Sequence, residues 1–169
     1  MTDQERSAGV VIGKVTAVRD PEGLGRIQVN YPWLSGREER WVPVASPMAG
    51  ADRGAFFMPE IEDEVMIAFD QGQWDHPYVI GFLWNPQQLP PSTDERQRMI
   101  RSRNGHTIRF VDSTPTAGNQ GALIMEDAHG NVVVMTNGRL AINSVGRLDV
   151  SAPVVTLNSR IVRPTGGPI

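Results

Sequence analysis

The 169-residue chain contains no cysteine, which excludes disulfide bonds and thiolate metal sites. It also contains no apolar run of membrane-spanning length. Its first eight residues, MTDQERSA, are polar and lack the apolar core of a signal peptide. We therefore expect a chain that is made in the cytoplasm and whose export, if any, needs another machine.

The sequence also lacks an excess of basic residues and a helical spacing of apolar residues. The formal net charge is −3, whereas a nucleic-acid-binding surface normally carries an excess of positive charge. No stretch keeps the helical spacing of apolar residues, and 17 glycines and 13 prolines punctuate the sequence. Hydrophobic residues make up 40% of the chain, which is enough for a core. These features predict an all-β protein.

The first half of the chain contains five segments with the alternation and β-branched content of strands. They are Gly9–Arg19, Arg26–Tyr31, Trp41–Ala45, Asp63–Phe69 and Pro77–Trp84. The turn Asp20–Gly25 is rich in glycine and proline, as turns are. Short strands at this spacing predict a small barrel or sandwich.

A proline-rich segment, Pro86–Arg98, separates the two halves. It holds three prolines and almost no apolar residue, so a central strand is not expected there. The predicted organisation is a polar arm, a barrel, a linker and a second module. Their bounds are Met1–Ala8, Gly9–Asn85, Pro86–Arg98 and Met99–Ile169.

The second module begins with two expected strands, Thr107–Val111 and Ala122–Met125, and continues as a repeat. Gly130, Gly138 and Gly146 are spaced by eight residues, and a short alternating strand is expected after each. The apolar residues predicted to form a common core are Val132, Val134, Leu140, Ile142, Leu148, Val150, Val155 and Leu157. Two aliphatic side chains per repeat do not offset the ordering of eight residues, so we expect other chains to complete the core.

Four carboxylates, Glu60, Glu62, Asp63 and Glu64, precede an expected strand. Paired carboxylates can perform hydrolysis, which keeps a cell-wall hydrolase as one alternative function. Acid/base pairs need separate environments that move their pKa values apart, and a contiguous acidic turn does not supply these. We interpret the cluster as a solvated turn and predict no enzyme activity.

The three histidines, His76, His106 and His129, do not share a metal-ligand spacing. No Ser/His/Asp arrangement, phosphate loop or dinucleotide motif is present, so we predict no metal and no cofactor. The histidines are interpreted as surface or turn residues.

Aromatic residues suggest a second alternative, a nucleic-acid-binding module that stacks bases. The candidates are Trp33, Trp41, Trp74, Trp84, Tyr31, Phe56, Phe57 and Tyr78. No basic run is interleaved with them, so core packing and subunit contacts are the preferred interpretation. Gly54–Pro59 is expected to be an exposed apolar loop or a strand.

Several motifs, by their order and spacing, resemble one family. They are Asp20–Arg26, Tyr31–Trp33, Val44–Gly50, Gly54–Glu60, Asp63–Val65, Tyr78–Asn85, Asn104–Phe110, Met125–Asp127 and Gly130–Asn131. The chain resembles the oligosaccharide/oligonucleotide-binding (OB) barrels of contractile-tail central spikes, the phage baseplate assembly protein V and VgrG family. The resemblance implies an OB-like barrel followed by a C-terminal β-helix or β-prism needle built from three chains.

The same resemblance implies a structural, non-enzymatic function. The homotrimer would be a virion or particle component that docks on a baseplate hub protein and pierces the target envelope mechanically. It implies no nucleic-acid partner. Members with a metal at the tip use a His-x-His motif, which this sequence lacks.

The C-terminal segment is the last candidate site. Blunt-ended members of the family are capped by a separate PAAR-type tip protein, and open strand edges invite pairing. The residues expected to dock this cap are Ile161, Val162, Pro164, Thr165, Gly166, Gly167, Pro168 and Ile169. A frayed tail is the alternative interpretation.

Overall fold

The computed structural model describes residues 9–32, 39–114 and 118–162. The chain divides into two compact units, Met1–Pro90 and Pro91–Ile169, and each is described by itself. Both are built from strands, and within the described residues the first also contains a three-residue 3-10 turn, η2 (Asp70–Gly72).

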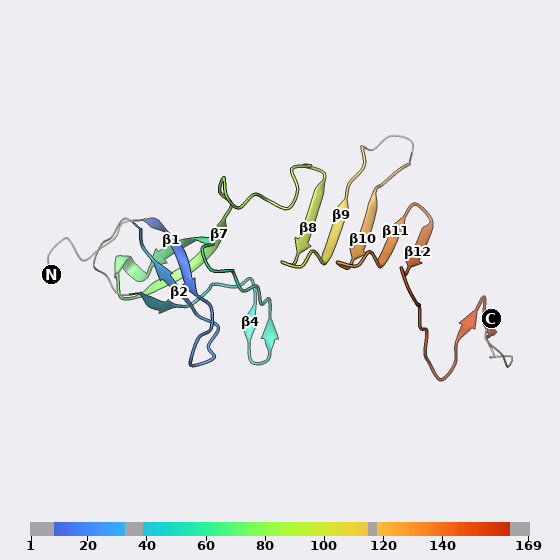
Figure 1. Cartoon of the computed structure of the whole chain (residues 1–169), viewed down its shortest axis with the longest axis horizontal. Helices are drawn as coiled ribbons and strands as arrows, with labels where there is room; N and C mark the ends of the chain where they lie inside the picture. Colours follow the sequence, from blue (N-terminus) through green and yellow to red (C-terminus); the bar gives the residue numbers. More distant parts are fainter. Residues whose placement is uncertain (1–8, 33–38, 115–117, 163–169) are drawn as a thin grey trace. The chain divides into compact units, whose positions relative to one another are not determined.

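The first unit is a five-stranded antiparallel sheet in the order β3-β2-β1-β6-β7. Its strands are β1 (Val10–Ala17), β2 (Ile27–Asn30), β3 (Arg40–Val42), β6 (Glu64–Phe69) and β7 (Pro77–Leu83). They coincide with the five segments expected from the sequence, because alternation between turn residues marks half-buried strands. Figure 1 shows them wrapped around one another.

The chain after β3 closes this sheet into a barrel. Val44 forms a parallel bridge with Val79 of β7. The Val79 amide donates to the Pro43 carbonyl at 2.9 Å, and the Ala45 amide donates to the Val79 carbonyl at 2.8 Å. A closed sheet leaves fewer free edges, which stabilises a small β domain.

The barrel interior is filled by side chains of one strand face. The buried apolar residues are Val15, Ile27, Val29, Tyr31, Val42, Val65, Ile67, Phe69 and Val79. Gly13 of β1 lies against this core, and a Cβ atom there would stand 2.7 Å from the Ile67 Cδ1 atom. Glycine is therefore required for close packing at this point of the strand.

The sequence did not predict a small hairpin, β4 (Ala49–Gly50) and β5 (Arg53–Gly54), that projects from the barrel. Its strands are two residues long and contain no β-branched residue, so they lack the usual strand pattern.

The segment expected to be a linker is partly structured. Asn85 and Gln88 form a bridge, and the Gln88 side-chain amide donates to the Asp63 carboxylate at 2.9 Å. At its other end, β8 begins at Gln97. The expected linker is therefore too long, because Gln97 and Arg98 belong to the sheet of the second unit.

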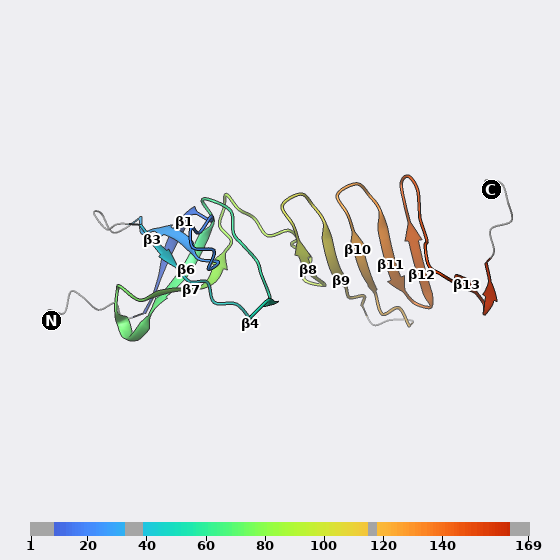
Figure 2. The same ribbon diagram turned by 90° about the horizontal axis from the view of Figure 1, so that it is seen from below.

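The second unit is a five-stranded antiparallel meander in the order β12-β11-β10-β9-β8. Its strands are β8 (Gln97–Arg101), β9 (Thr107–Val111), β10 (Ala122–Glu126), β11 (Val132–Thr136) and β12 (Arg139–Asn143). Figure 2 shows the five strands side by side in sequence order. Each strand is five residues long, so the sheet has an even width.

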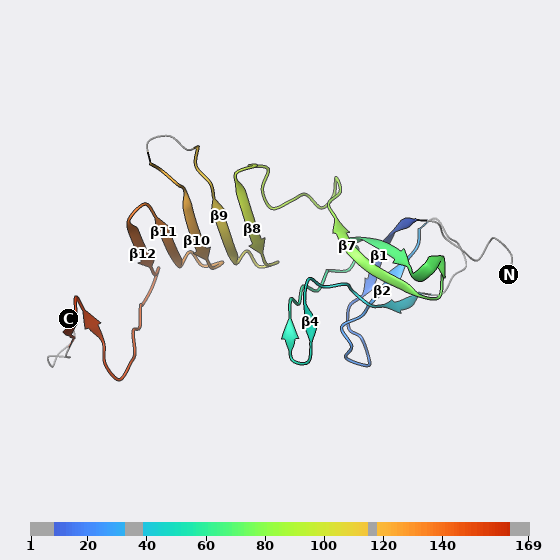
Figure 3. The same ribbon diagram turned by 180° about the vertical axis from the view of Figure 1, so that it is seen from behind.

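This sheet is a single layer. Figure 3 shows it from behind, with no second described layer of its own unit against it. Among residues 91–114, 118–160 and 162, none is buried. The second unit therefore has no core of its own within the part of the chain that the structure describes.

The chain beyond β12 departs from the expected repeat. The structure assigns no strand to Leu148–Val150, so the strand predicted there is wrong. A short hairpin follows, with β13 (Thr156–Leu157) and β14 (Arg160–Ile161). Within the described ranges, the structure contains no helix with the length and apolarity that a membrane crossing requires.

Candidate assembly surface

The strand register of the second unit places nine apolar side chains on one face, in two rows that run across the strands. The first row is Ile100, Ile108, Met125, Val133 and Ile142, and the second contains Phe110, Leu123, Met135 and Leu140. We call these nine residues the apolar band. Directly opposed residues of neighbouring strands share a face, which is why the rows are continuous.

The apolar band is open to solvent. Exposed fractions include 43% for Ile108, 52% for Phe110 and 61% for Leu140. A shallow hollow of about 480 Å³ lies over the first row and is lined by Ile108, Met125, Val133, Ile142 and Leu148, among others. Contiguous exposed apolar surface of this kind marks interaction sites in soluble proteins.

Polar residues border the band at both strand ends. At one end, Ser102 pairs with His106 and Asp127 pairs with Asn131 through backbone hydrogen bonds. At the other end, the Asp112 amide donates to the Arg96 carbonyl at 2.9 Å. The apolar surface is therefore two side chains wide along each strand, with water-compatible turns on either side.

The turns at the first border are tied together by side chains. The Asp127 carboxylate accepts the Asn131 side-chain amide at 2.6 Å and the backbone amides of Asn131 and His129 at 2.9 and 2.8 Å. These hydrogen bonds, the Asn131 side chain first, lower the pKa of Asp127 to about 2. Asn131 Oδ1 accepts the Val145 amide at 3.0 Å, which connects the next segment of chain.

The predicted core set does not lie on one face. Val133 is paired with Ile142, and Met135 with Leu140, so Val132 and Val134 point to the opposite side. The expectation that Val132 and Val134 share a face with Leu140 and Ile142 is therefore wrong.

The reason for the error is the two-residue turn Asn137–Gly138 between β11 and β12. This turn pairs Thr136 with Arg139, so even-numbered residues of β11 meet odd-numbered residues of β12. Residues eight positions apart share a face only if the two strands run in the same direction, related by translation. In an antiparallel hairpin of this register they lie on opposite faces. An Asn-Gly pair between alternating segments is a strong hairpin motif, so the sequence did contain the information needed.

The opposite face of the meander is mixed in character. Arg109 of β9 and Glu126 of β10 form an ion pair there, with 3.0 Å between the Arg109 Nη2 and Glu126 Oε2 atoms. Val132, Val134 and Ala141 are half-buried on this face. The middle row of this face, Met99, Arg109, Ile124, Val134 and Ala141, holds one charge among four apolar residues. The flanking rows are more polar, so this face is less apolar than the apolar band.

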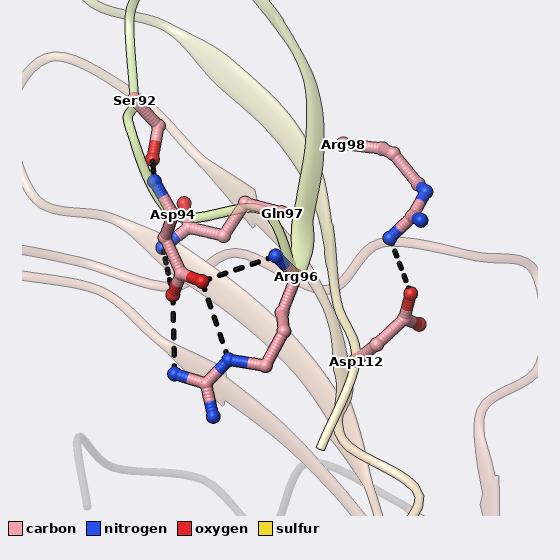
Figure 4. A network of polar contacts seen from close by, with 6 residues as sticks. All are labelled: Ser92, Asp94, Arg96, Gln97, Arg98 and Asp112. Atoms are coloured by element: carbon pink, nitrogen blue, oxygen red, sulfur yellow. Dashed lines mark hydrogen bonds and ion pairs between the residues drawn. The ribbon is translucent and has the colours of Figure 1, made fainter. Parts of the chain in front are cut away.

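A cluster of polar contacts lies where the second unit begins (Figure 4). Asp94 accepts the backbone amide of Arg96 at 3.0 Å and its Nε atom at 3.2 Å, which holds the turn before β8. This backbone bond and the Arg96 side chain lower the pKa of Asp94. Arg98, one strand residue further, forms an ion pair with Asp112.

A second ordered surface belongs to the barrel, at the β1–β2 loop. The Asp20 carboxylate accepts the backbone amides of Glu22, Leu24 and Arg26 and both the Nε and Nη2 atoms of Arg26. The Arg26 guanidinium, first of all, holds the pKa of Asp20 well below its usual value. The loop is fixed in shape by one nearly inaccessible carboxylate.

This loop presents Leu24 beside the β4–β5 hairpin. A hollow of about 760 Å³ is lined by Leu24, Met48, Phe56, Phe57 and Phe82, among others. Phe56 and Phe57 are 76% and 57% exposed. The expected exposed apolar segment within Gly54–Pro59 is thus present, and it lies in a loop after β5 rather than in a strand.

The acidic cluster before β6 is a hydrogen-bonded turn. The Asp63 carboxylate accepts the Glu60 amide at 2.8 Å, and Glu62 pairs with Lys14 at 3.4 Å. Its four carboxylates do not converge on a cleft among the hollows described above. The arrangement terminates a turn and positions the start of β6.

The histidines lie apart from one another. His76 stands 3.7 Å from the Asp75 carboxylate on the barrel, and His129 is exposed in a turn. His106 Nδ1 accepts the Ala128 amide at 3.2 Å. No three carboxylate or imidazole side chains gather as metal ligands among the residues that the structure describes.

The aromatic residues do not form one platform. Trp74 packs against Phe69, with ring centres 4.3 Å apart, and meets Tyr31 edge-on at 6.4 Å. Trp84 is 71% exposed, and Trp33 lies outside the described residues. The interior cluster contributes to the barrel core, while the exposed Phe56, Phe57 and Phe82 line the separate hollow described above.

The expected tip-docking residues are only partly described. Ile161 lies in β14, and the Val162 amide donates to the Val155 carbonyl at 2.7 Å. Pro164, Thr165, Gly166, Gly167, Pro168 and Ile169 lie outside the described residues.

Comparison with known proteins places the barrel in a family. Residues 11–84 match the family model of the type VI secretion system/phage-baseplate injector OB domain. The first unit is similar to an injector OB domain. The predicted resemblance to the baseplate V and VgrG family is thereby confirmed. The matched residues run from β1 to just after β7, and they include the sequence of the hairpin β4–β5.

Three curated relatives contain segments similar to part of this chain. The type VI secretion system spike protein VgrG2a of Pseudomonas aeruginosa is 36% identical over 72 residues, which are 40% of this chain and 9% of the relative. The spike protein VgrG3 of Vibrio cholerae is 31% identical over 113 residues, 61% of this chain and 11% of the relative. The actin cross-linking toxin VgrG1 of Vibrio cholerae is 32% identical over 91 residues, which are 47% of this chain and 8% of the relative.

The chain therefore spans about a tenth of the length of these relatives. The match to VgrG3, at 113 residues, is longer than the part of this chain that matches the injector OB domain model, residues 11–84. These findings support a structural role related to spikes of secretion systems and phage baseplates.

Proposed function

We propose that this protein is the central spike component of a contractile injection particle or phage tail baseplate. Its role is mechanical: it forms a rigid needle that pierces the target envelope, and it performs no chemistry. The observation that carries this proposal is the apolar band on a single-layer sheet. A sheet that buries nothing by itself needs further chains to complete a core.

Three copies are the proposed assembly. Three identical sheets arranged around an axis would enclose their apolar bands and expose their mixed faces, as the β-prism or β-helix expected from the sequence requires. Closed cyclic symmetry is the usual arrangement of soluble homo-oligomers. The needle would continue through Leu148, Val150, Val155 and Leu157, of which all but the half-buried Val155 are exposed in the single chain.

The barrel would connect the needle to the hub. Its fixed β1–β2 loop and the neighbouring Phe56 and Phe57 offer exposed apolar contacts, and Phe and Met are enriched in interfaces. We propose the hub protein of the baseplate as the partner of this surface.

The far end of the needle would dock a PAAR-type tip protein. The hairpin β13–β14 is followed by Val162, which is 46% exposed. We propose that Ile161, Val162 and Pro164–Ile169 form this platform, in a particle assembled from chains made in the cytoplasm.

The oligomeric state of the full-length chain tests the proposal. Native mass spectrometry and multi-angle light scattering at micromolar concentration should give three chains per particle. A folded monomer, with the meander sheet intact by amide hydrogen exchange, would contradict it.

A further inference from the structure

One charge interrupts the apolar band. The two rows contain five positions each, and nine of these ten positions are apolar. The tenth is Arg98, which lies opposite Phe110 in the second row, on the edge strand β8. An arginine on an otherwise apolar face has no role in enclosing a core, so it calls for another explanation.

The counterion of Arg98 comes from the same chain. Asp112 lies diagonally across from Arg98, just beyond the end of β9, and the Arg98 Nη1 and Asp112 Oδ2 atoms are 2.5 Å apart. Both side chains are exposed, at 65% and 59%. An exposed ion pair contributes little to the stability of a single chain. Its effect changes when the face around it is covered.

The charge pattern identifies the partner that covers this face. The rows are uncharged apart from Arg98, and Asp112 neutralises that charge within the chain. The face therefore offers no net charge to a partner of opposite sign, and its complement is an equally apolar face with the same corner pair. Another copy of this chain has that surface.

We infer that Arg98, with Asp112, fixes the register in which copies of this chain associate through the apolar band. This inference rests on the proposed self-association. Apolar rows resemble one another, so a copy displaced by one row would keep similar apolar contacts. Only Arg98 distinguishes the two arrangements, because the displaced copy would meet this charge with an apolar row.

The physical reason is the cost of covering a charge away from its counterion, which is high in an apolar contact. In the correct register, the corner pair remains at the polar border, next to the turn residues Arg96 and Asp94. A single polar residue in an apolar seam sets register in coiled coils, and the same principle applies to sheets.

The test measures distances between copies in the full-length protein. Because the chain has no cysteine, Asn104→Cys in the exposed β8–β9 turn provides a unique position for a spin label. We expect one narrow distribution of label distances for the otherwise unchanged protein. Arg98→Leu should add a second distance peak, since the displaced register no longer covers a charge.

Two further variants complete the design. Arg101→Leu makes the same change on the same strand but on the opposite face, and it should keep one narrow peak. Arg98→Gln removes the charge and keeps a polar side chain, so it serves if Arg98→Leu does not fold. Arg98→Gln should also broaden the distribution of label distances, toward the second distance expected for Arg98→Leu.

The outcomes separate the two proposals. An oligomer whose single narrow peak persists in both Arg98→Leu and Arg98→Gln overturns the register role while leaving the self-association standing. A second peak in Arg101→Leu as well would also overturn it, because the effect would not depend on the face. An unlabelled protein that is monomeric by native mass spectrometry overturns the proposed function itself.

Discussion

The two units of this protein use the same strand pattern in opposite ways. In the barrel, the sheet closes on itself through Val44 and Val79, and nine apolar residues are removed from water within one chain. In the meander, strands of similar length lie in one open layer, and a comparable number of apolar residues remain exposed. Alternation therefore determines that a face is apolar, but topology determines whether the chain can cover it.

The largest expected effect comes from charging the apolar band. Ile142→Asp places an unpaired carboxylate in the first row, and we expect it to destabilise the assembly by at least about 3 kcal/mol per chain. Asn143→Asp changes the next residue on the opposite face and should leave the oligomer intact. Light scattering and thermal unfolding of both variants measure the difference. Equal behaviour of the pair would remove the distinction between the faces.

Shortening a core side chain should destabilise the barrel whether or not the chain associates with other copies. Ile67→Ala removes a fully buried side chain and should lower the free energy of barrel unfolding by about 2–5 kcal/mol. Ile61→Ala alters an exposed isoleucine in a turn and should stay within about 0.5 kcal/mol.

Protein concentration separates the two transitions further. Calorimetry over a range of concentrations should show a barrel transition that does not move and a sheet transition that rises, since association stabilises only the second unit. Two transitions that move together would show that the barrel also depends on association.

A smaller effect is expected at the β1–β2 loop. Asp20→Asn leaves one neutral amide where a carboxylate accepts five N–H groups, and it removes the ion partner of Arg26. The barrel transition should shift down by a few degrees, with the sheet transition unchanged. Asp75→Asn, at an exposed carboxylate, is the matched control. Equal shifts in the two variants would deny Asp20 its structural role.

The smallest expected effect is the acid sensitivity of the sheet turns. The pKa of Asp127 is lowered from 3.8 to about 2, so its contribution to folding is complete above the ordinary value. That contribution is lost as the pH falls from about 4 to about 2. Across this pH interval, the melting temperature of the sheet transition should change less with pH for Asp127→Asn than for the unchanged protein. Parallel curves would contradict the assignment.

Local patterns explain which parts of the fold were predictable. The five barrel strands alternate between turns rich in glycine and proline, so their bounds follow from local sequence. The hairpin β4–β5 has no such pattern, since Ala49–Gly50 and Arg53–Gly54 contain no residue with strand preference. Barrel closure depends on a contact between Val44 and Val79, which are distant in sequence.

The assembly surface was predictable only in part. Leu140 and Ile142 were identified from their alternation, and they lie in the apolar band. Val133 and Met135 were missed because the glycine spacing was interpreted as translation, whereas the turn Asn137–Gly138 reverses the chain. Ile108 and Met125 are joined in one row by strands whose connection includes a long loop, and no local pattern fixes that register.

The even width of the meander has an evolutionary consequence. Every strand contributes two side chains to the face of the apolar band and three to the opposite face, and the polar turns limit how far the apolar surface extends along a strand. Adding a hairpin therefore lengthens the stack by roughly 9–10 Å without altering its cross-section. Duplication or loss of short sequence segments would change the reach of such a sheet in steps.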